Sequence, residues 1–296
     1  MNRILALNLL SVYLIWGSTY YAIKLSIEAM PPLLMLAARF FIAALIIRFF
    51  CLLKDIRFPK SAGAYFSEFA VGNLLLLGGL GAVAFAEKWI SSALAAIVIA
   101  TVPIWLLVLD FLINRKRVST IEALLLAVGF VGVVMLHYYE IKGHSLFVIV
   151  LCLIAPLSWS LGSLLQKRVA ARRPLDAIVS SCLQMFFASV SFLLLFLLSP
   201  NEFYFRLNPP ALFSVVYLII FGSLLAFSSY IYLCNQNISP VLLGSYAYVN
   251  PVVAILIGLS LGGEFISANG YIAIAIILSS VMLLISQQHR TGTTKD

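Results

Sequence analysis

Charged side chains are scarce in this sequence. Asp, Glu, Lys and Arg make up only 10% of the residues, whereas soluble domains carry about 25%. Apolar residues make up 63%, well above the ~45–50% that is usual in soluble domains. A soluble globular domain is therefore excluded, and the composition indicates a chain that lies in a membrane.

Metal-binding and nucleotide-binding patterns are also missing. No two cysteines have C-x-x-C spacing and no two histidines are four residues apart, so neither a disulfide framework nor a metal site is indicated. The sequence has no G-x-x-x-x-G-K-[ST] loop that would bind nucleotide phosphates. We therefore expect no metal and no cofactor. The residues concerned are Cys51, Cys152, Cys182, Cys234, His137, His144 and His289.

Ten long apolar runs fill most of the chain. A helix needs about 20 apolar residues to cross a hydrocarbon core of ~30 Å, so ten crossings use roughly 200 residues and leave short links. The runs predict an all-α membrane protein with ten transmembrane helices. The expected spans are residues 4–24, 33–53, 63–86, 91–113, 119–138, 145–166, 176–198, 211–235, 240–260 and 267–286.

Basic residues between these runs set the expected orientation. With the N-terminus inside, thirteen Lys and Arg residues lie in cytoplasmic segments and only four lie in outer loops. The sequence thus predicts a multi-pass protein of the inner (plasma) membrane with both termini in the cytoplasm. The first run has no A-x-A cleavage site, so we expect a retained helix instead of a signal peptide. The basic residues follow no polar face, which argues against nucleic acid as a partner.

An internal repeat divides the chain into two halves. Because five spans per half is an odd number, the second half must enter the membrane with opposite polarity, as in transporters built from inverted repeats. We expect two inverted five-helix repeats, at residues 1–140 and 141–286, and a cytoplasmic tail at 287–296. Two corresponding pairs are 143 residues apart: Trp16 with Trp159, and Lys24 with Lys167. Two others are 148 residues apart: Ile90-Ser91 with Ile238-Ser239, and Pro103 with Pro251.

Short motifs occur in a fixed order along the chain: Trp16-Gly17-Ser18, Arg39-Phe40, Pro103, Pro251, and Gly262-Gly263-Glu264 followed by the helix from Gly270 to Ile285. With the span count and the duplication, they resemble the drug/metabolite transporter superfamily, of the ten-helix type with two EamA domains. One departure is Lys116, which stands where the first repeat of that family usually has a Glu. The resemblance implies an exporter of amino acids or related metabolites that has no ATPase of its own.

Polar and aromatic side chains in the middle of the spans are the candidates for substrate binding, because such groups need partners at that depth. Asn73 and Asn250 can each donate and accept a hydrogen bond, although contacts between helices would also explain them. Aromatic faces favour apolar substrates and can hold an ammonium group with roughly 0.5–2 kcal/mol. The predicted substrate-binding residues are Trp16, Tyr20, Asn73, Thr101, Trp105, Trp159, Tyr230, Tyr246, Tyr248 and Asn250.

Three prolines and one arginine are expected to act as hinges or gates. Pro103, Pro156 and Pro251 each remove a backbone donor, which kinks a helix or frees a carbonyl for a substrate ammonium. Arg39 lies about six residues, or roughly 9 Å, inside the second span. Its guanidinium can pair with a substrate carboxylate, pair with a polar neighbour or extend to the interface. We favour a structural or gating role, since the resemblance suggests that this Arg accompanies many substrates.

Glu68 is the acid that lies clearly within a predicted span, a few residues from its cytoplasmic end. It is the candidate proton carrier, although a carboxylate that faces the cytoplasm needs no such role.

Taken together, these patterns predict a secondary transporter that exports or exchanges small organic metabolites, chiefly amino acids or related zwitterions, by alternating access. We expect a monomer whose partners are the small-molecule substrate and the lipid bilayer. An enzyme is disfavoured because no Ser/His/Asp or paired-carboxylate arrangement occurs at membrane depth. A flippase for lipids or lipid-linked molecules, and an amine or drug exporter of the same fold, remain alternatives.

Overall fold

The described part of the chain is built from helices. The computed structural model describes residues 3–86, 98–115, 119–136, 146–199, 203–206, 208–262 and 268–292. Ile90-Ser91, Lys116, Glu264 and the predicted boundary between residues 140 and 141 lie outside these ranges. The helices are α1 (Arg3–Ala29), α2 (Pro32–Leu53), α3 (Ala62–Gly72), η1 (Asn73–Gly81), α4 (Ala82–Ala86), α6 (Val102–Asn114), α7 (Thr120–Leu136), α8 (Leu146–Arg172), α9 (Ala177–Leu198), α10 (Pro209–Tyr217), η3 (Leu218–Phe227), α11 (Ser228–Cys234), α12 (Pro240–Gly244), α13 (Tyr246–Gly262) and α14 (Ala268–Gly292).

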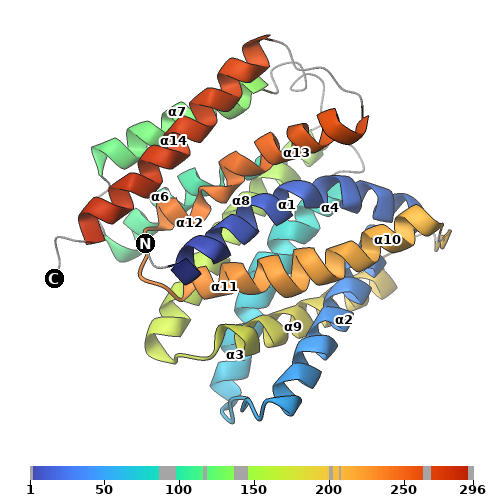
Figure 1. Cartoon of the computed structure of the whole chain (residues 1–296). Helices are drawn as coiled ribbons and strands as arrows, with labels where there is room; N and C mark the ends of the chain where they lie inside the picture. The colour runs from blue at the N-terminus through green and yellow to red at the C-terminus, as the bar shows by residue number, and fades with distance from the viewer. Residues whose placement is uncertain are drawn as a thin grey trace.

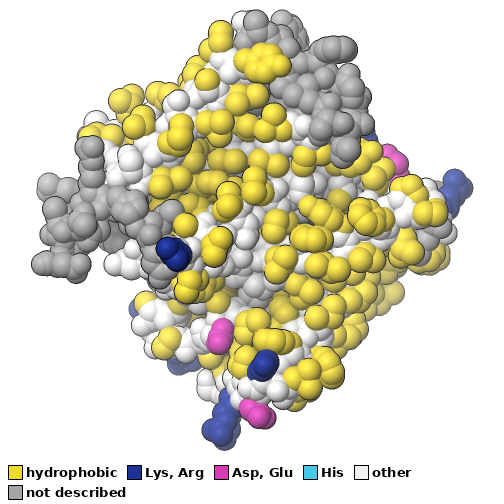
Figure 2. Space-filling view, viewed as in Figure 1, with side chains coloured by type: hydrophobic (Ala, Val, Ile, Leu, Met, Phe, Trp, Pro, Cys, Tyr) yellow, Lys and Arg dark blue, Asp and Glu magenta, His cyan; other side chains and the backbone are white. Residues whose placement is uncertain are grey.

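These helices overlap every predicted span, and α14 extends six residues beyond the expected end at 286. Among the described residues, six helical stretches are long and apolar enough to cross a membrane by length and composition. Large apolar side chains are exposed along them, and Figure 2 shows apolar side chains over most of the visible face, with the few charged ones mostly toward its edges. A water-exposed surface of this kind would be unfavourable, so the chain is an all-α membrane protein. The six stretches are Arg3–Ala29, Pro32–Leu53, Ala62–Ala86, Ala177–Leu198, Pro209–Cys234 and Asn269–Gln287.

Helix α1 lies at the centre of the packing. It contacts α13 along one side and α10, η3 and α11 along another. Figure 1 shows the pair α7 and α14 at one edge of the molecule and α2, α3 and α9 at the opposite edge, with α1 between them. Helix α8 packs against η1 and α6, and α6 also packs against α12.

Four helices begin where a polar side chain accepts a hydrogen bond from the first turn. Such caps satisfy N–H groups that have no partner within the helix. Proline in the first turn of α2, α6, α10 and α12 marks a start as well, because it has no N–H to leave unpaired. The capping pairs are Ser61 with Ala64, Asp176 with Ile178, Asn208 with Ala211 and Ser239 with Leu242.

Several of the long helical stretches are interrupted. The third predicted span contains the π-helical η1, and the eighth contains the π-helical η3. The ninth is divided at Ser245 into α12 and α13, and a turn at Ala100–Thr101 precedes α6. Because π-helical turns and breaks are common at functional sites, these interruptions direct attention to the residues beside them.

Glycine allows the backbones of α3 and α9 to approach closely. A Cβ at Gly72 would lie 2.6 Å from the main-chain oxygen of Gln184 and 2.8 Å from its Cα. Backbone atoms cannot move aside as a flexible side chain can, so only glycine fits at this crossing.

We predict that Gly72→Ala lowers the stability of the protein by about 1–3 kcal/mol, because the methyl group pushes α3 away from α9. Thermal unfolding of the purified protein in detergent measures the effect. Gly63→Ala is the matched control, since its Cβ would meet only the end of the exposed Arg173 side chain. Equal melting temperatures for the two variants would contradict this account of the helix crossing.

Candidate functional site

A cavity lies where helices from the two halves of the chain meet around α1. Its volume is about 70 Å³, room for about five water molecules. Apolar and aromatic side chains form most of its wall, and a few polar groups point into it, as is typical of small-molecule sites. The lining residues are Trp16, Thr19, Tyr20, Ile23, Arg39, Phe40, Leu76, Gly79, Leu80, Val83, Ala84, Ile99, Trp159, Gly222, Phe227, Tyr246 and Asn250.

Four aromatic rings from four helices form one cluster beside the cavity. Trp16 of α1 lies 5.3 Å from Trp159 of α8, 5.1 Å from Tyr230 of α11 and 4.9 Å from Tyr246 of α13, measured between ring centroids. Tyr230 also lies within 5.6 Å of both Trp159 and Tyr246. We call Trp16, Trp159, Tyr230 and Tyr246 the aromatic cluster. Its edge-to-face and tilted contacts are the arrangements that aromatic pairs prefer.

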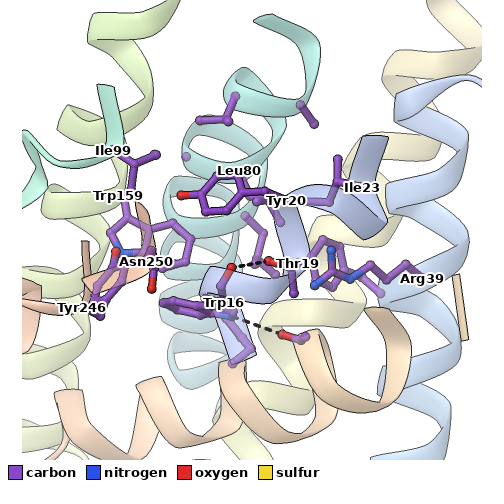
Figure 3. A pocket seen from close by; sticks show the side chains of 17 residues that line it. Trp16, Thr19, Tyr20, Ile23, Arg39, Leu80, Ile99, Trp159, Tyr246 and Asn250 are labelled. Atoms are coloured by element: carbon purple, nitrogen blue, oxygen red, sulfur yellow. Dashed lines mark hydrogen bonds between the residues drawn. The ribbon is translucent and has the colours of Figure 1, made fainter. Parts of the chain in front are cut away.

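Hydrogen bonds hold the rings of this cluster in place. The Trp159 indole N–H donates to the Tyr230 hydroxyl at 3.0 Å, and that hydroxyl also bonds to Ser163 Oγ at 2.6 Å. The Trp16 indole N–H donates to the main-chain oxygen of Gly222 at 3.3 Å (Figure 3). The polar atoms of the two indoles are thus satisfied, and the ring faces remain available to the cavity.

Arg39 brings a positive charge to the cavity wall although only 2% of its surface is exposed. Its Nε donates to Ser223 Oγ at 2.8 Å, and its Cζ lies 5.0 Å from the centre of the Phe40 ring. Ser223 in turn donates to the main-chain oxygen of Leu218, five residues earlier in η3. A Cβ at Gly222 would lie 2.6 Å from Arg39 Nη2, so this glycine makes room for the guanidinium.

Asn250 is 2% exposed and lines the cavity on the side of Trp159 and Tyr246 (Figure 3). In the orientation that satisfies its amide, the side-chain nitrogen donates to the main-chain oxygens of Tyr246 at 3.0 Å and Tyr13 at 3.3 Å. The bond to Tyr13 joins α13 to α1, so Asn250 connects two helices and also borders the cavity.

The structure places six of the predicted site residues on the cavity wall: Trp16, Tyr20, Arg39, Trp159, Tyr246 and Asn250. Tyr230 joins the aromatic cluster without lining the cavity. Four others do not line it: Asn73, Thr101, Trp105 and Tyr248. Asn73 and Thr101 donate to main-chain oxygens of their own segments, and Tyr248 donates to Leu126 of α7 at 3.0 Å.

One of the predicted hinge prolines lies at the start of a helix, and the other two lie inside helices. Pro103 is in the first turn of α6, directly after the turn at Ala100–Thr101. Pro156 and Pro251 lie inside α8 and α13, which continue past them. A Cβ at Gly244 of α12 would lie 3.0 Å from Pro103 Cα, so α6 and α12 approach closely at this point.

Glu68 lies outside the cavity in a separate polar network. Its two carboxylate oxygens accept hydrogen bonds from Ser180 Oγ at 3.1 Å and from Gln184 Nε2 at 2.6 Å. Gln184 also donates to Gln166 at 2.9 Å, and Gln166 donates to Asn235 at 2.8 Å. The network therefore joins α3, α9, α8 and the end of α11. In the described part of the chain, no three His, Cys, Asp or Glu residues come close enough to hold a metal ion.

Comparison with known proteins identifies the family. The sequence profile of the EamA-like transporter family matches residues 3–138 and again residues 146–286. The chain belongs to the EamA-like transporter family. Its place in the drug/metabolite transporter superfamily, predicted from the sequence motifs, is thereby confirmed.

Relatives of this transporter carry similar descriptions. The uncharacterized inner membrane transporter YedA of Escherichia coli (strain K12) is 34% identical over 277 residues, 93% of this chain and 89% of YedA. A probable amino-acid metabolite efflux pump of Salmonella typhimurium (strain LT2) is 24% identical over 173 residues, 58% of this chain and 56% of the pump. A solved crystal structure of a protein with 20% identity has a TM-score of 0.79 and covers 97% of this chain and 98% of that chain, so the two share a fold.

Sequence reasoning missed several residues that shape the transporter's cavity. Thr19, Phe227 and Ser223 gave no signal, because they are ordinary members of apolar runs. Gly79 and Gly222 did carry one. They are 143 residues apart, the same separation as Trp16 and Trp159, and both lie in π-helical segments on the cavity wall.

We predict that Tyr230→Phe destabilises the transporter by about 1–3 kcal/mol, because it leaves the buried Trp159 N–H without its acceptor. A lower melting temperature of the purified protein measures the loss. Tyr232→Phe, on the same helix but partly exposed, is the control and should change the melting temperature little. If the two variants have the same melting temperature, the Tyr230 hydroxyl does not hold the aromatic cluster in place.

Proposed function

We propose that the chain is a secondary transporter that exports or exchanges small organic metabolites, amino acids or related zwitterions, by alternating access. The observation that carries this proposal is the cavity. It is lined by aromatic faces, by the Asn250 amide and by the Arg39 guanidinium, at the junction of helices from both family-matched halves. Such a site offers an apolar surface for a side chain and polar groups for the charged ends of a zwitterion.

We propose further that ten spans form two inverted repeats in the inner (plasma) membrane, with both termini in the cytoplasm. The packing supports this arrangement, because corresponding segments have corresponding neighbours: α1 packs on η3, and α8 packs on η1. Helix α1 begins and α14 ends on the same side of the molecule in Figure 1, as an even number of crossings requires. A midplane site between repeats is the usual plan of such transporters.

Contacts on one side of the cavity support access from one side at a time. Tyr13, one turn before Trp16 in α1, bonds to Ser245 between α12 and α13 at 2.5 Å. Lys167 Nζ donates to the main-chain oxygens of Gln236 and Ile238, both at 3.0 Å, and so ties α8 to the link between α11 and α12. Alternating access requires these contacts to separate when the cavity opens toward that side.

Substrate class is argued from the site and from the relatives. The name of the Salmonella relative, a probable amino-acid metabolite efflux pump, favours export of amino-acid metabolites. The rivals are a lipid or lipid-linked molecule flippase and an amine or drug exporter of the same fold. A flippase requires a cavity open to lipid between two helices, and an amine exporter would place an acid at its site. No Asp or Glu is among the lining residues in the described part of the chain. We propose a monomer that needs no further protein partner.

Asn250→Ala is predicted to abolish transport, because it removes the amide at the cavity wall. The measurement is counterflow of radiolabelled amino acids into proteoliposomes preloaded with a mixture of neutral and aromatic amino acids. Asn8→Ala is the control, since the Asn8 amide donates to the main-chain oxygen of Ile4 in its own helix. Wild-type rates for Asn250→Ala at equal protein abundance would remove Asn250 from the site.

We also propose that Glu68 couples transport to protons. Its carboxyl group is fully buried, and its hydrogen-bond partners among the described residues, Ser180 and Gln184, are neutral donors. A buried carboxylate without a cation is costly, so the protonated form is favoured whenever water is excluded. The buried Gln184 Oε1 has no donor among the described residues, and a protonated Glu68 could supply one after the amide turns. By sequence, the titratable residues of the packed helices α8 and α9 are Cys152, Lys167, Arg168, Arg172 and Cys182, and Arg173 directly follows α8.

For this coupling we expect wild-type proteoliposomes to accumulate substrate when a pH gradient is imposed. Glu68→Gln should lose this accumulation and keep counterflow, because its amide can still hydrogen-bond to Ser180 and Gln184 but cannot change protonation state. Glu28→Gln, at an exposed position near the end of α1, is the control. Wild-type uptake that does not depend on the pH gradient would refute the coupling role, and the protein would then be a facilitator or an exchanger.

A further inference from the structure

Arg39 has hydrogen-bonding capacity that the described residues do not use. A guanidinium carries five N–H donors and no acceptor. Nε donates to Ser223, whereas the buried Nη1 has no hydrogen-bond partner in the described part of the chain. More than nine-tenths of buried polar groups in proteins are paired, so this unpaired atom of a residue that lines the cavity calls for an acceptor.

The charge of Arg39 is not balanced by any acid that the structure describes. The described residues of the cavity wall include no Asp or Glu. The buried acids among the described residues are Glu68 and Asp110, and each accepts hydrogen bonds elsewhere, Glu68 from Ser180 and Gln184, and Asp110 from Asn114. A buried cation without a counterion is unfavourable, and an anion entering the cavity would relieve that cost.

The geometry indicates which anion fits. Figure 3 shows Arg39 on one side of the cavity and Trp159, Tyr246 and Asn250 on the other, with Trp16 and Thr19 between them. Among the lining residues that the structure describes, Arg39 is the single cationic side chain, which suits a singly charged group better than a phosphate. A planar carboxylate matches the fork of a guanidinium and can accept from its free edge. The aromatic cluster then faces the remainder of the solute.

We infer that Arg39 binds the carboxylate of the transported solute, so that a free carboxylate is a condition for entry into the cavity. This inference rests on the proposed function, because it takes the cavity as the transport site. It replaces the gating role expected for Arg39 from the sequence with direct binding. Ser223 acts as a positioning residue, since its hydroxyl accepts from Nε and is itself anchored on Leu218 of η3.

The test compares each of the twenty standard amino acids with its carboxamide, which keeps the side chain and the ammonium but removes the negative charge. Binding to the full chain in lipid nanodiscs is followed by quenching of tryptophan fluorescence, because Trp16 and Trp159 line the cavity. We expect at least one amino acid to bind saturably and its carboxamide to bind roughly 10- to 100-fold more weakly, as for the loss of a charge-assisted hydrogen bond.

Variants of Arg39 separate binding from folding. Arg39→Gln should bind the amino acid and the carboxamide with equal, low affinity. Arg39→Lys keeps the charge but loses the fork, so it should retain the preference at reduced affinity. Arg48→Gln is the matched control on the same helix, because Arg48 is exposed and lies 4.4 Å over the Phe58 ring, away from the cavity. It should keep the full preference.

Three results would overturn the inference: equal binding of both members of a pair by the wild type, a preference that survives in Arg39→Gln, or no saturable binding of any amino acid by folded protein. Counterflow in the same preparation separates this failure from that of the proposed function. Transport without a carboxylate preference overturns the role of Arg39 alone. Carboxylate-dependent binding without any transport overturns the proposed function and supports the assignment of Arg39.

Discussion

The contact of four aromatic rings from α1, α8, α11 and α13 is the constraint on which the centre of the molecule depends. In a bilayer the hydrophobic effect does not drive helices together, because lipid tails are as apolar as leucine. Close packing and hydrogen bonds must do this instead. The rings of Trp16, Trp159, Tyr230 and Tyr246 provide both, since they pack edge to face and each indole N–H has an acceptor. The cavity lies beside these rings, and Trp16, Trp159 and Tyr246 form part of its wall.

The sequence predicts how deep a residue lies in the membrane better than it predicts which side of its helix the side chain occupies. The apolar runs located the helices, and the offset between Trp16 and Trp159 indicated two residues that meet. Tyr246 and Tyr248, in contrast, look equivalent in the sequence. They are two residues apart, about 200° around a helix, so Tyr246 faces the cavity while Tyr248 reaches Leu126 of α7. Asn73 was a candidate by depth alone, yet its amide bonds back to Phe69. The π-helical turns have no sequence signature that could have been used.

Two of the buried charged residues, Arg39 and Glu68, have contrasting surroundings. Arg39 borders the cavity, with the neutral Ser223 as its hydrogen-bond acceptor. Glu68 is enclosed by neutral donors that belong to a network across four helical segments. Neither group is paired with the other, so a counterion for Arg39 or a proton for Glu68 must come from elsewhere. Groups of this kind are costly to keep in a membrane and are generally retained for function, because packing alone would favour apolar replacements.

The π-helical segments η1 and η3 give the cavity wall one more property. A π-turn contains an additional residue relative to an α-turn and is bonded from residue i to residue i+5. A helix that contains such a turn therefore has one residue more than a regular α-helix of the same number of turns. If the wide turn moves along the helix by one position, the side chains that it passes rotate by about 100° and advance by about 1.5 Å, while the number of backbone hydrogen bonds stays the same. The two helical segments that carry Gly79 and Gly222 in the cavity wall can therefore change the cavity's shape without unfolding.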